Sequence, residues 1–278
     1  MLEKLNYPIF LLCKVMQVSK SGYYKWYLIK DSKEKNNILL EEEIKKIYAS
    51  SRGTYGRRRV LSTLKKSFIN VGKKRVSKIM DKLQLNGIGK PKFKITTKLD
   101  AKATRCPDLI SGNFTSYKPN QIWTSDITYI PTKEGWIYLC IILDTFSRVI
   151  VGWCMQNTLK REIVINSLNM AYHKRGGFPV GIIFHSDKGT QYSSSDVKKY
   201  LKINRFHQSM SNSCYDNSIS ETFFSTLKKE LVHRCNFQTR KEGMTAVTEY
   251  IEVFYNRIRA HSALDYQAPL EYEKNYEI

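Results

Sequence analysis

The feature that most constrains the fold is an unbroken apolar run, "GWIYLCIILDTF", at residues 135–146. A strand that is apolar at almost every position has no face for solvent, so it predicts an interior strand in a sheet covered on both sides. The preceding segment, "QIWTSDITYI" at 121–130, alternates apolar and polar residues, as a strand with one polar face does. A third strand is expected in "RVIVGWCM" at 148–155, after a tight turn.

Helix and strand patterns alternate in the rest of this region. A short helix is expected to be capped by Ser194 or Ser195, because serine hydroxyls accept hydrogen bonds from the first turn of a helix. Antiparallel hairpins come first and crossover connections come later, which predicts an α/β architecture with a mixed sheet flanked by helices. The helical patterns lie at 159–175, 194–204 and 216–234, and the strand patterns at 180–187 and 205–210.

Basic side chains are concentrated in the first third of the chain. The net charge is +21, of which +16 lies in residues 1–100 and +5 in residues 101–278. A basic segment beside a nearly balanced body favours a polyanion-binding module attached to a separate core. A lysine-rich solvent face without a ligand is the alternative.

Glycines divide the basic third into helical pieces. Three helices are expected at 38–49, 57–68 and 73–85, and two shorter ones within residues 8–27. The second of the short helices is expected to begin at Ser19 or Ser21.

The helix expected at 73–85 has two different faces. Its apolar face predicts packing in a small core, and its basic face suits the second helix of a helix-turn-helix, which enters the major groove while nearby cations neutralise phosphates. An ordinary three-helix bundle is the alternative. The apolar residues are Val76, Ile79, Met80 and Leu83. The residues expected to contact DNA are Arg57, Arg58, Arg59, Lys73, Lys74, Arg75 and Lys78.

These patterns predict the domain organisation. Residues 1–86 form a basic helical DNA-binding region, and residues 119–278 form the α/β core with a helical carboxyl-terminal tail. Residues 87–118 show no sustained period and contain prolines and several lysines, which is typical of a linker.

The cysteines and the hydropathy pattern exclude several classes of protein. The chain has 6 cysteines but no CxxC pair, and several lie in apolar runs, which indicates reduced thiols of a cytosolic protein and no zinc site. There is no apolar run of membrane-spanning length, and the start lacks the cleavage pattern of a signal peptide.

Three acidic side chains lie on the elements expected in the body. Asp126 lies on the polar face of the strand at 121–130. Asp187 follows a buried strand at its carboxyl end, where open α/β sheets bind ligands. Glu221 lies on the helix at 216–234, in a polar stripe opposite its apolar face. Hard divalent cations prefer such oxygen ligands, so the pattern is compatible with a metal site, although acids near strand ends are also common in structural roles.

Several segments resemble, in order, those of a known family. "WTSDITYI", "HSDKGTQY" and "DNSISETFFSTLKKEL" are similar to the catalytic segments of insertion-sequence transposases whose second reading frame encodes a retroviral-integrase-like domain. "IYASSRGTYGRRRV" with "GKKRVSKIM" resembles their second helix-turn-helix segment, and "YNRIRAHSALDYQAPLEYE" resembles their carboxyl-terminal part. The resemblance covers nearly the whole chain.

The resemblance implies a fold, an activity and a catalytic site. It implies a ribonuclease H-like integrase catalytic core and a DDE-type transposase, a polynucleotidyl transferase and nuclease. Such an enzyme cleaves phosphodiester bonds at element ends and transfers the strand by attack of the freed 3′-OH. By motif, Asp126, Asp187 and Glu221 are the catalytic and metal-binding acids for two Mg²⁺ or Mn²⁺ ions, with Asp126 bridging both.

The resemblance also implies partners and a location. The DNA partners are the terminal inverted repeats of the element and the target DNA. A protein from the first reading frame and further copies of this chain on DNA are the implied protein partners. The expected location is the bacterial cytoplasm, in association with the nucleoid and not with a membrane.

The chain departs from the family pattern in two places. The spacing between Asp187 and Glu221 is shorter than is usual in the family, and the shortening falls in "SMSNSCYDNS", residues 209–218. A trimmed loop before the helix is expected. The chain also lacks the His/Cys spacing of the amino-terminal zinc domain of retroviral relatives.

Five other residues near these motifs have two interpretations each. Asp144 is favoured as a structural cap of its turn over a fourth metal ligand, and His185 as a hydrogen-bonded structural histidine over a residue that positions water. Lys228 either holds a substrate phosphate or is a solvated helix charge. Gln191 and Tyr192 either contact DNA or close their loop, and loop closure is slightly favoured.

Two other functions compete with transposition. A decayed element product would bind terminal repeats without cutting them, and the shortened spacing is the only feature in its favour. A general ribonuclease or resolvase on the same fold would need no specific DNA ends, and a dedicated helix-turn-helix region argues against it.

Overall fold

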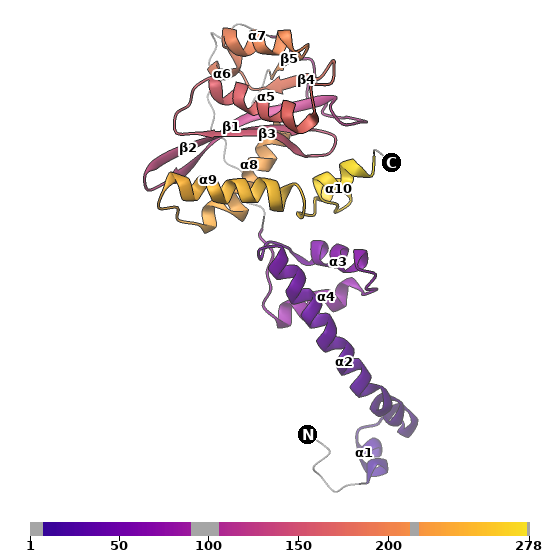
Figure 1. The fold of residues 1–278 in the computed structure, drawn as a ribbon. Coiled ribbons are helices and arrows are strands. Elements are labelled where there is room, and N and C mark those ends of the chain that lie inside the picture. Colours follow the sequence, from indigo (N-terminus) through magenta and orange to yellow (C-terminus); the bar gives the residue numbers. More distant parts are fainter. Residues whose placement is uncertain (1–7, 90–105, 212–216, 277–278) are drawn as a thin grey trace. The chain divides into compact units, whose positions relative to one another are not determined.

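The structure is a computed structural model that describes residues 8–89, 106–211 and 217–276. The chain divides into two compact units, residues 1–87 and residues 88–278 (Figure 1). Within the described ranges, no helix is both long enough and apolar enough to cross a membrane.

The first unit begins with a short helix and a long one, α1 at Ile9–Val15 and α2 at Lys20–Ser50. The expected break between a helix ending near residue 27 and another beginning at residue 38 is therefore wrong. Ser19 Oγ accepts a hydrogen bond of 3.1 Å from Gly22 N and caps the start of α2, as expected. Between Gly22 and Ser50 there is no glycine or proline, so the sequence contains nothing that would end the helix earlier.

Two further helices complete the first unit, α3 at Arg57–Lys66 and α4 at Lys73–Lys82. Both begin at the predicted residue and end two or three residues early. Their apolar faces meet that of α2 in a small core, which confirms the two-faced character predicted for the helix at 73–85. The most buried core residues are Ile44, Val60, Leu64, Val76 and Met80.

The second unit is built on a five-stranded sheet in the order β3-β2-β1-β4-β5. The first three strands are antiparallel neighbours, and β4 and β5 continue the sheet in parallel. The apolar strand β2 lies between β3 and β1 and is buried on both faces, as its sequence predicts. The strands are β1, Ile122–Thr132; β2, Gly135–Asp144; β3, Ile150–Gln156; β4, Ile183–Ser186; and β5, His207–Met210.

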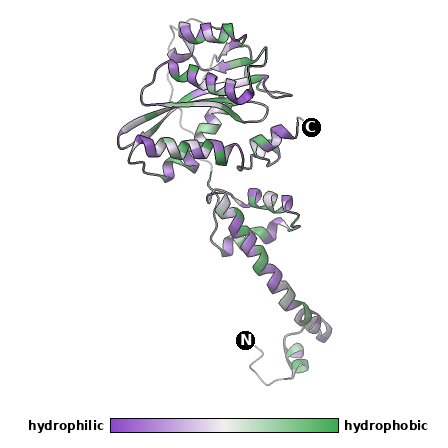
Figure 2. Ribbon diagram, viewed as in Figure 1, coloured by the Kyte–Doolittle hydropathy of each residue, from purple (hydrophilic) through white to green (hydrophobic). Residues whose placement is uncertain are grey.

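Helices cover both faces of this sheet (Figure 1). On one face α5 and its neighbours enclose a core around Trp123, Ile142 and Phe184. On the other face α8 and α9 enclose a core that contains Ile141 and Phe223. The covering helices carry hydrophobic and hydrophilic residues along the same length, as one-sided packing requires (Figure 2). The helices are α5, Glu162–Arg175; α6, Thr190–Ser193; α7, Ser195–Ile203; α8, Ser218–Glu230; and α9, Arg240–Glu249.

The carboxyl-terminal tail is fastened to the end of α8. A π-helical segment, η3 at Tyr250–Tyr255, continues α9. Arg259 then donates hydrogen bonds of 2.8 Å from Nε and Nη2 to the two carboxylate oxygens of Glu230, and both side chains are buried. Tyr250 donates a third hydrogen bond of 2.8 Å to the same carboxylate. The last elements are short: η2, Val232–Arg234; η4, Ser262–Leu264; and α10, Pro269–Lys274.

Part of the expected linker, residues 90–105, lies outside the described residues. Its described part, residues 106–118, runs along the second unit. Pro107 O accepts a hydrogen bond of 3.2 Å from Met210 N, and Leu109 N donates one of 2.9 Å to Ser209 Oγ. These bonds attach this stretch to the edge strand β5.

Candidate active site

Asp126 and Asp187 lie next to each other in the register of the sheet. Strand β4 pairs in parallel with β1, and the last pair joins Ser125 to Ser186. Each aspartate is the residue that follows its member of this pair. Neighbouring strands are about 4.8 Å apart, so the two backbones place these carboxyl groups at one point, where β1 and β4 separate.

Asp126 points toward the face of the sheet that α8 covers. Its strand neighbour on that face, Thr124, accepts a hydrogen bond of 2.9 Å from Ser220 Oγ on α8. Trp123, on the alternate face, belongs to the opposite core. The predicted face of Asp126, shared with Thr124 and opposite Trp123, is therefore confirmed.

The start of α8 is fixed over this part of β1. Asn217, the residue before the helix, donates a hydrogen bond of 3.1 Å from Nδ2 to Ser125 O. The contact between Ser220 and Thr124 lies one turn further along. Glu221 is in the first turn of α8 and is exposed, so the helix presents its carboxylate beside the strand that carries Asp126.

The pKa of Asp126 reflects its burial and the charged groups around it. Burial raises the pKa of this carboxyl to about 8, and repulsion from Asp187 and, more weakly, from Glu221 adds to the rise. Two groups act in the opposite direction. Ile127 N donates a hydrogen bond of 2.8 Å to Asp126 Oδ1, and the ammonium of Lys228 favours the ionised form. Asp187 and Glu221 are thus both near enough to Asp126 to raise its pKa.

The other two acids have raised pKa values as well. Burial raises the pKa of Asp187, and a hydrogen bond of 3.0 Å from Gly189 N to Oδ1 opposes the rise. Glu221 is exposed as a whole residue, but partial burial of its carboxyl group also raises its pKa. In the described ranges, no three His, Cys, Asp or Glu side chains are grouped closely enough to hold a metal ion together.

Lys228 lies two turns after Glu221 and reaches the same site. Its Nζ is 5.1 Å from the centroid of the Tyr129 ring, and that ring lies 5.0 Å from the ring of Trp136. Burial lowers the pKa of Lys228, and the nearby Asp126 opposes this change. The ammonium is therefore half-buried beside the acids and is not a freely solvated charge.

Two of the remaining candidates near the acids, His185 and Tyr192, have structural roles. His185 is fully buried, and its Nδ1 lies 2.9 Å from Ser209 Oγ, so the structural interpretation is confirmed. Tyr192 is also buried, and its hydroxyl lies 2.9 Å from Ser125 Oγ, which makes it part of the core behind Asp126. Gln191 lies in the short helix α6, where its carbonyl accepts a hydrogen bond of 2.8 Å from Ser194 Oγ.

Asp144 is a buried structural acid, as its favoured interpretation predicts. Its oxygens accept hydrogen bonds of 2.7 Å from Asn120 N and 2.9 Å from Phe146 N, and a longer one of 3.3 Å from Trp123 Nε1. Arg175 Nη2 lies 3.5 Å from the same carboxylate. This carboxylate closes the turn after β2, and the full set of partners leaves it no role at the site of Asp126.

Sequence reasoning did not predict the contacts that hold these elements together. Ser125, Asn217 and Ser220 are small polar residues beside the predicted acids, and their hydrogen bonds join β1 to α8. Small polar residues flanking an acid on a strand and on a helix are the only signal that pointed to them. Their partners are far apart in the chain, so the pairing itself needed the structure.

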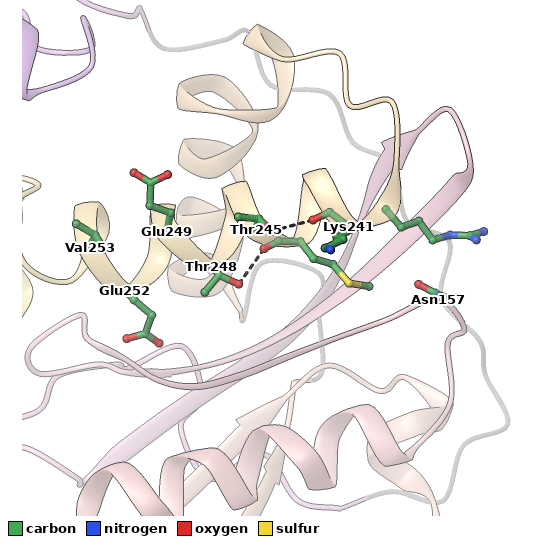
Figure 3. A pocket seen from close by; sticks show the side chains of 9 residues that line it. Asn157, Lys241, Thr245, Thr248, Glu249, Glu252 and Val253 are labelled. Carbon is green, nitrogen blue, oxygen red and sulfur yellow. Dashed lines mark hydrogen bonds between the residues drawn. The ribbon is translucent and has the colours of Figure 1, made fainter.

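A separate groove of about 610 Å³ lies along α9 (Figure 3). It is lined by α9, the start of η3 and Asn157, which follows β3. Its threonines, Thr245 and Thr248, donate hydrogen bonds to carbonyls of their own helix. None of the three predicted acids lines it, so this groove is distinct from the candidate site.

The predicted DNA-contacting residues of the first unit are mostly at its surface. Arg58 on α3 and Lys73, Lys74 and Lys78 on α4 are exposed. Three arginines are also engaged within the unit. Arg57 pairs with Asp81 at 2.5 Å, Arg75 donates a hydrogen bond of 2.6 Å to Asn37, and the half-buried Arg59 lies over the ring of Tyr55.

Comparison with known families divides the chain as the structure does. Residues 34–93 match the HTH-like domain, and residues 116–214 and 221–276 match the integrase core domain. A chain of the simian T-cell lymphotropic virus intasome is similar at 15% identity, with a TM-score of 0.47 over 83% of this chain and 74% of that chain.

Curated relatives match the chain over almost its whole length. The "Insertion element IS600 uncharacterized 31 kDa protein" of Shigella sonnei is 37% identical over 95% of this chain and 98% of its own length. The "Transposase for insertion sequence element IS904" of Lactococcus lactis is 39% identical over 85% and 94%. The "Transposase InsF for insertion sequence IS3A" of Escherichia coli is 30% identical over 96% and 94%. The chain therefore belongs to the insertion-sequence transposases that combine an HTH-like domain with an integrase core domain.

Proposed function

We propose that this transposase cleaves a phosphodiester bond at the end of its insertion element and then joins the freed 3′-OH to a second phosphodiester bond. The observation that carries the proposal is the adjacency of Asp126 and Asp187 at the ends of paired strand segments, with Glu221 on α8 near enough to act on Asp126, within an integrase core. Burial and the two neighbouring carboxylates together raise the pKa of Asp126 to about 8. A cluster of like charges is costly unless a cation compensates for it, which is why such clusters mark functional sites.

The donor set fits Mg²⁺ or Mn²⁺. Both prefer oxygen ligands, and Mg²⁺ takes only one or two protein carboxylates while keeping water or substrate oxygens as its other ligands. Asp126 and Asp187, adjacent across β1 and β4, would hold one ion, and Asp126 with Glu221 a second. When bound, such ions stabilise negative charge on the attacking and leaving oxygens of an in-line displacement.

Other residues around the site position the acids and the substrate. Ile127 N holds one oxygen of Asp126 and so fixes the direction of its carboxylate. The half-buried ammonium of Lys228 is placed to hold an oxygen of a substrate phosphate beside the acids. Asn217 and Ser220 hold the helix of Glu221 against β1, which keeps the acids at a fixed separation.

The first unit supplies binding to DNA. We infer that α4 enters the major groove, with Lys73, Lys74, Arg75 and Lys78 near its start, while Arg57, Arg58 and Arg59 at the start of α3 meet the phosphate backbone. The exposure of most of these side chains and the match to the HTH-like domain support this assignment. The DNA partners are the terminal repeats and the target.

Transposition joins two element ends, so we propose that several copies of this chain act together on DNA. A first-reading-frame protein is a further proposed partner, in keeping with the two-frame organisation that the sequence resemblance implies. The proposed place of action is the bacterial cytoplasm, at the nucleoid. The proposed domain limits are 1–86, 87–118 and 119–278.

The test is strand cleavage on the element's own end. Full-length protein is mixed with Mg²⁺ and a labelled duplex that ends in the terminal repeat, with and without the first-frame protein, and Glu221→Gln is run beside it. We expect 3′-end cleavage that needs the metal and is lost in the variant while DNA binding is retained. Specific binding without any cleavage, in either protein and with or without the partner, would favour a protein that only occupies the repeats.

A further inference from the structure

Arg148 lies in the turn between β2 and β3 and lines two adjoining cavities of the second unit. One cavity, of about 270 Å³, lies between this turn and the start of α8. The other, of about 520 Å³, lies between the turn and residues 112–116. Ile219 and Ala263 also line both cavities, so Arg148 stands where the two meet.

Arg148 has no anionic partner in the part of the chain that the structure describes. Its Nε is buried without a hydrogen-bond partner, and no carboxylate of the described ranges forms an ion pair with it. Among the residues that the structure describes, no aspartate or glutamate lines either cavity. Asp144 acts on Arg148 from a distance, but its oxygens already accept hydrogen bonds from three other donors. Burial lowers the pKa of the Arg148 guanidinium, which is the cost of leaving such a cation without a counter-charge.

The walls around Arg148 carry the donors that a phosphate needs. Ser218 from the start of α8 and Ser262 from η4 bring hydroxyl groups to the smaller cavity. The hydroxyl of Thr222, which also lines it, already donates a hydrogen bond of 2.6 Å to Ser218 O. The first backbone N–H groups of a helix also attract anions. A guanidinium combined with hydroxyl donors is the usual surrounding of a phosphate oxygen in protein–DNA complexes.

The backbone at Arg148 is strained for an arginine. Its φ is +61°, a left-handed conformation that glycine adopts freely and that other residues disfavour. Arg205, between α7 and β5, has a similar φ of +59°, but it is exposed and lines neither cavity. The chain therefore contains a matched arginine in the same backbone conformation.

We propose that Arg148, with the hydroxyl groups of Ser218 and Ser262, binds one phosphate of the DNA backbone. This inference rests on the proposed function, which brings DNA to this unit. On α8, Ser218 comes three residues before Glu221, so the two side chains lie on neighbouring faces of the helix. The site therefore holds DNA across the same helix that presents Glu221, so it positions the substrate and takes no part in the chemistry.

The test is a scan of the DNA backbone with neutral linkages. Each phosphate near the cleaved end of the terminal-repeat duplex is replaced in turn by a methylphosphonate, and the affinity is measured for Glu221→Gln as the parent protein. We expect one linkage whose neutralisation lowers the affinity of the parent about tenfold. In Arg148→Gly on the same parent, the intact duplex should bind about tenfold more weakly, and the neutral linkage should cause no further loss.

Two controls separate this role from a structural one. Glycine removes the backbone strain at residue 148, so Arg148→Gly should melt at the same temperature as the parent or higher. Arg205→Gly removes the same charge and the same strain, and it should keep both the affinity and the response to the neutral linkage. A loss of affinity that is equal in the two glycine variants, or a lowered melting temperature in Arg148→Gly alone, would overturn the phosphate site.

The result is independent of cleavage, because the parent protein carries Glu221→Gln. If the wild-type protein fails to cleave but the linkage effect disappears in Arg148→Gly, the phosphate site stands and only the proposed chemistry fails. If the wild-type protein cleaves, but each neutral linkage changes the DNA affinity of Arg148→Gly and Arg205→Gly equally, the phosphate site is wrong and the proposed chemistry stands. Binding of inorganic phosphate at Arg148, with no effect of any neutral linkage on DNA affinity, would also overturn a DNA site.

Discussion

The side-chain amide of Asn217 donates a hydrogen bond of 3.1 Å to the backbone carbonyl of Ser125, the residue before Asp126. This bond joins the residue that precedes α8 to the middle of β1. Four residues separate Asn217 from Glu221, about one helical turn. The separation of the strand acid and the helix acid is therefore set by a contact that neither acid makes.

Asn217→Ala should reduce cleavage more than it reduces stability. Loss of one hydrogen bond with a buried carbonyl should cost about 1–3 kcal/mol of unfolding free energy, while a small displacement of Glu221 should lower the cleavage rate ~100-fold. DNA affinity should stay unchanged, because the residue faces the sheet. The measurements are denaturant unfolding, binding and single-turnover cleavage. Thr248→Ala also removes one side-chain hydrogen bond, in the groove along α9 away from the acids, so it is the control and should keep the cleavage rate. Equal rates in both variants would contradict the prediction.

Asp126→Asn should stabilise the metal-free protein, and more at higher pH. A carboxyl whose pKa is raised on folding holds its proton more tightly in the folded state. Its favourable contribution is therefore complete at low pH and is lost as the pH rises from 3.8 toward about 8. Asparagine carries no such penalty, so the gain from Asp126→Asn should be larger near pH 8 than near pH 5, by ~2 kcal/mol or more.

Thermal unfolding with a chelator at the two pH values measures this difference. Addition of Mg²⁺ near pH 8 should raise the melting temperature of the wild-type protein and leave Asp126→Asn almost unchanged. An asparagine variant with the same relative stability at both pH values would show that Asp126 ionises normally.

Lys228→Ala should move the pH dependence of cleavage. The ammonium favours the ionised form of Asp126, so its removal should raise the pKa of Asp126 further. The acidic limb of the pH–rate profile should then shift to higher pH by roughly one unit. Lys229→Ala removes the same charge from the next position, about 100° further around the helix, and should leave the limb in place. A loss of rate without a shift would mean that Lys228 binds substrate only.

Much of this site follows from local sequence patterns, and the rest depends on contacts between distant residues. Alternation in the strand at 121–130 predicted the face of Asp126, and the strand end predicted the place of Asp187. The alignment of β1 with β4 and the bonds from Asn217 and Ser220 could not be predicted, because they join residues more than 50 positions apart. In the first unit, glycines correctly predicted where α3 and α4 begin. The break expected within α2 was wrong, because no glycine or proline lies between residues 27 and 38 to cause it.

Lysines at the start of α4 should contribute more to DNA binding than Arg57 does. Lys73 and Lys74 are exposed and have no carboxylate partner in the ranges described, whereas Arg57 must first give up its contact of 2.5 Å with Asp81. Each lysine-to-alanine change should reduce the slope of log affinity against log salt by about one. Arg57→Ala should reduce it less. Titrations at several salt concentrations measure the slopes, and identical slopes in all variants would place the DNA elsewhere.

The buried pair of Glu230 and Arg259 should control the stability of the tail and of α8 together. Arg259→Met leaves the Glu230 carboxylate buried without its cation, while Tyr250 still donates to it, which should cost ~3–5 kcal/mol of unfolding free energy. The double variant Glu230→Met with Arg259→Met removes both charges and should recover most of this loss, apart from about 1–3 kcal/mol for the stranded Tyr250 hydroxyl. Denaturant unfolding of the two variants measures the difference. A double variant as unstable as the single one would mean that packing of the arginine stem, and not the unpaired charge, causes the loss.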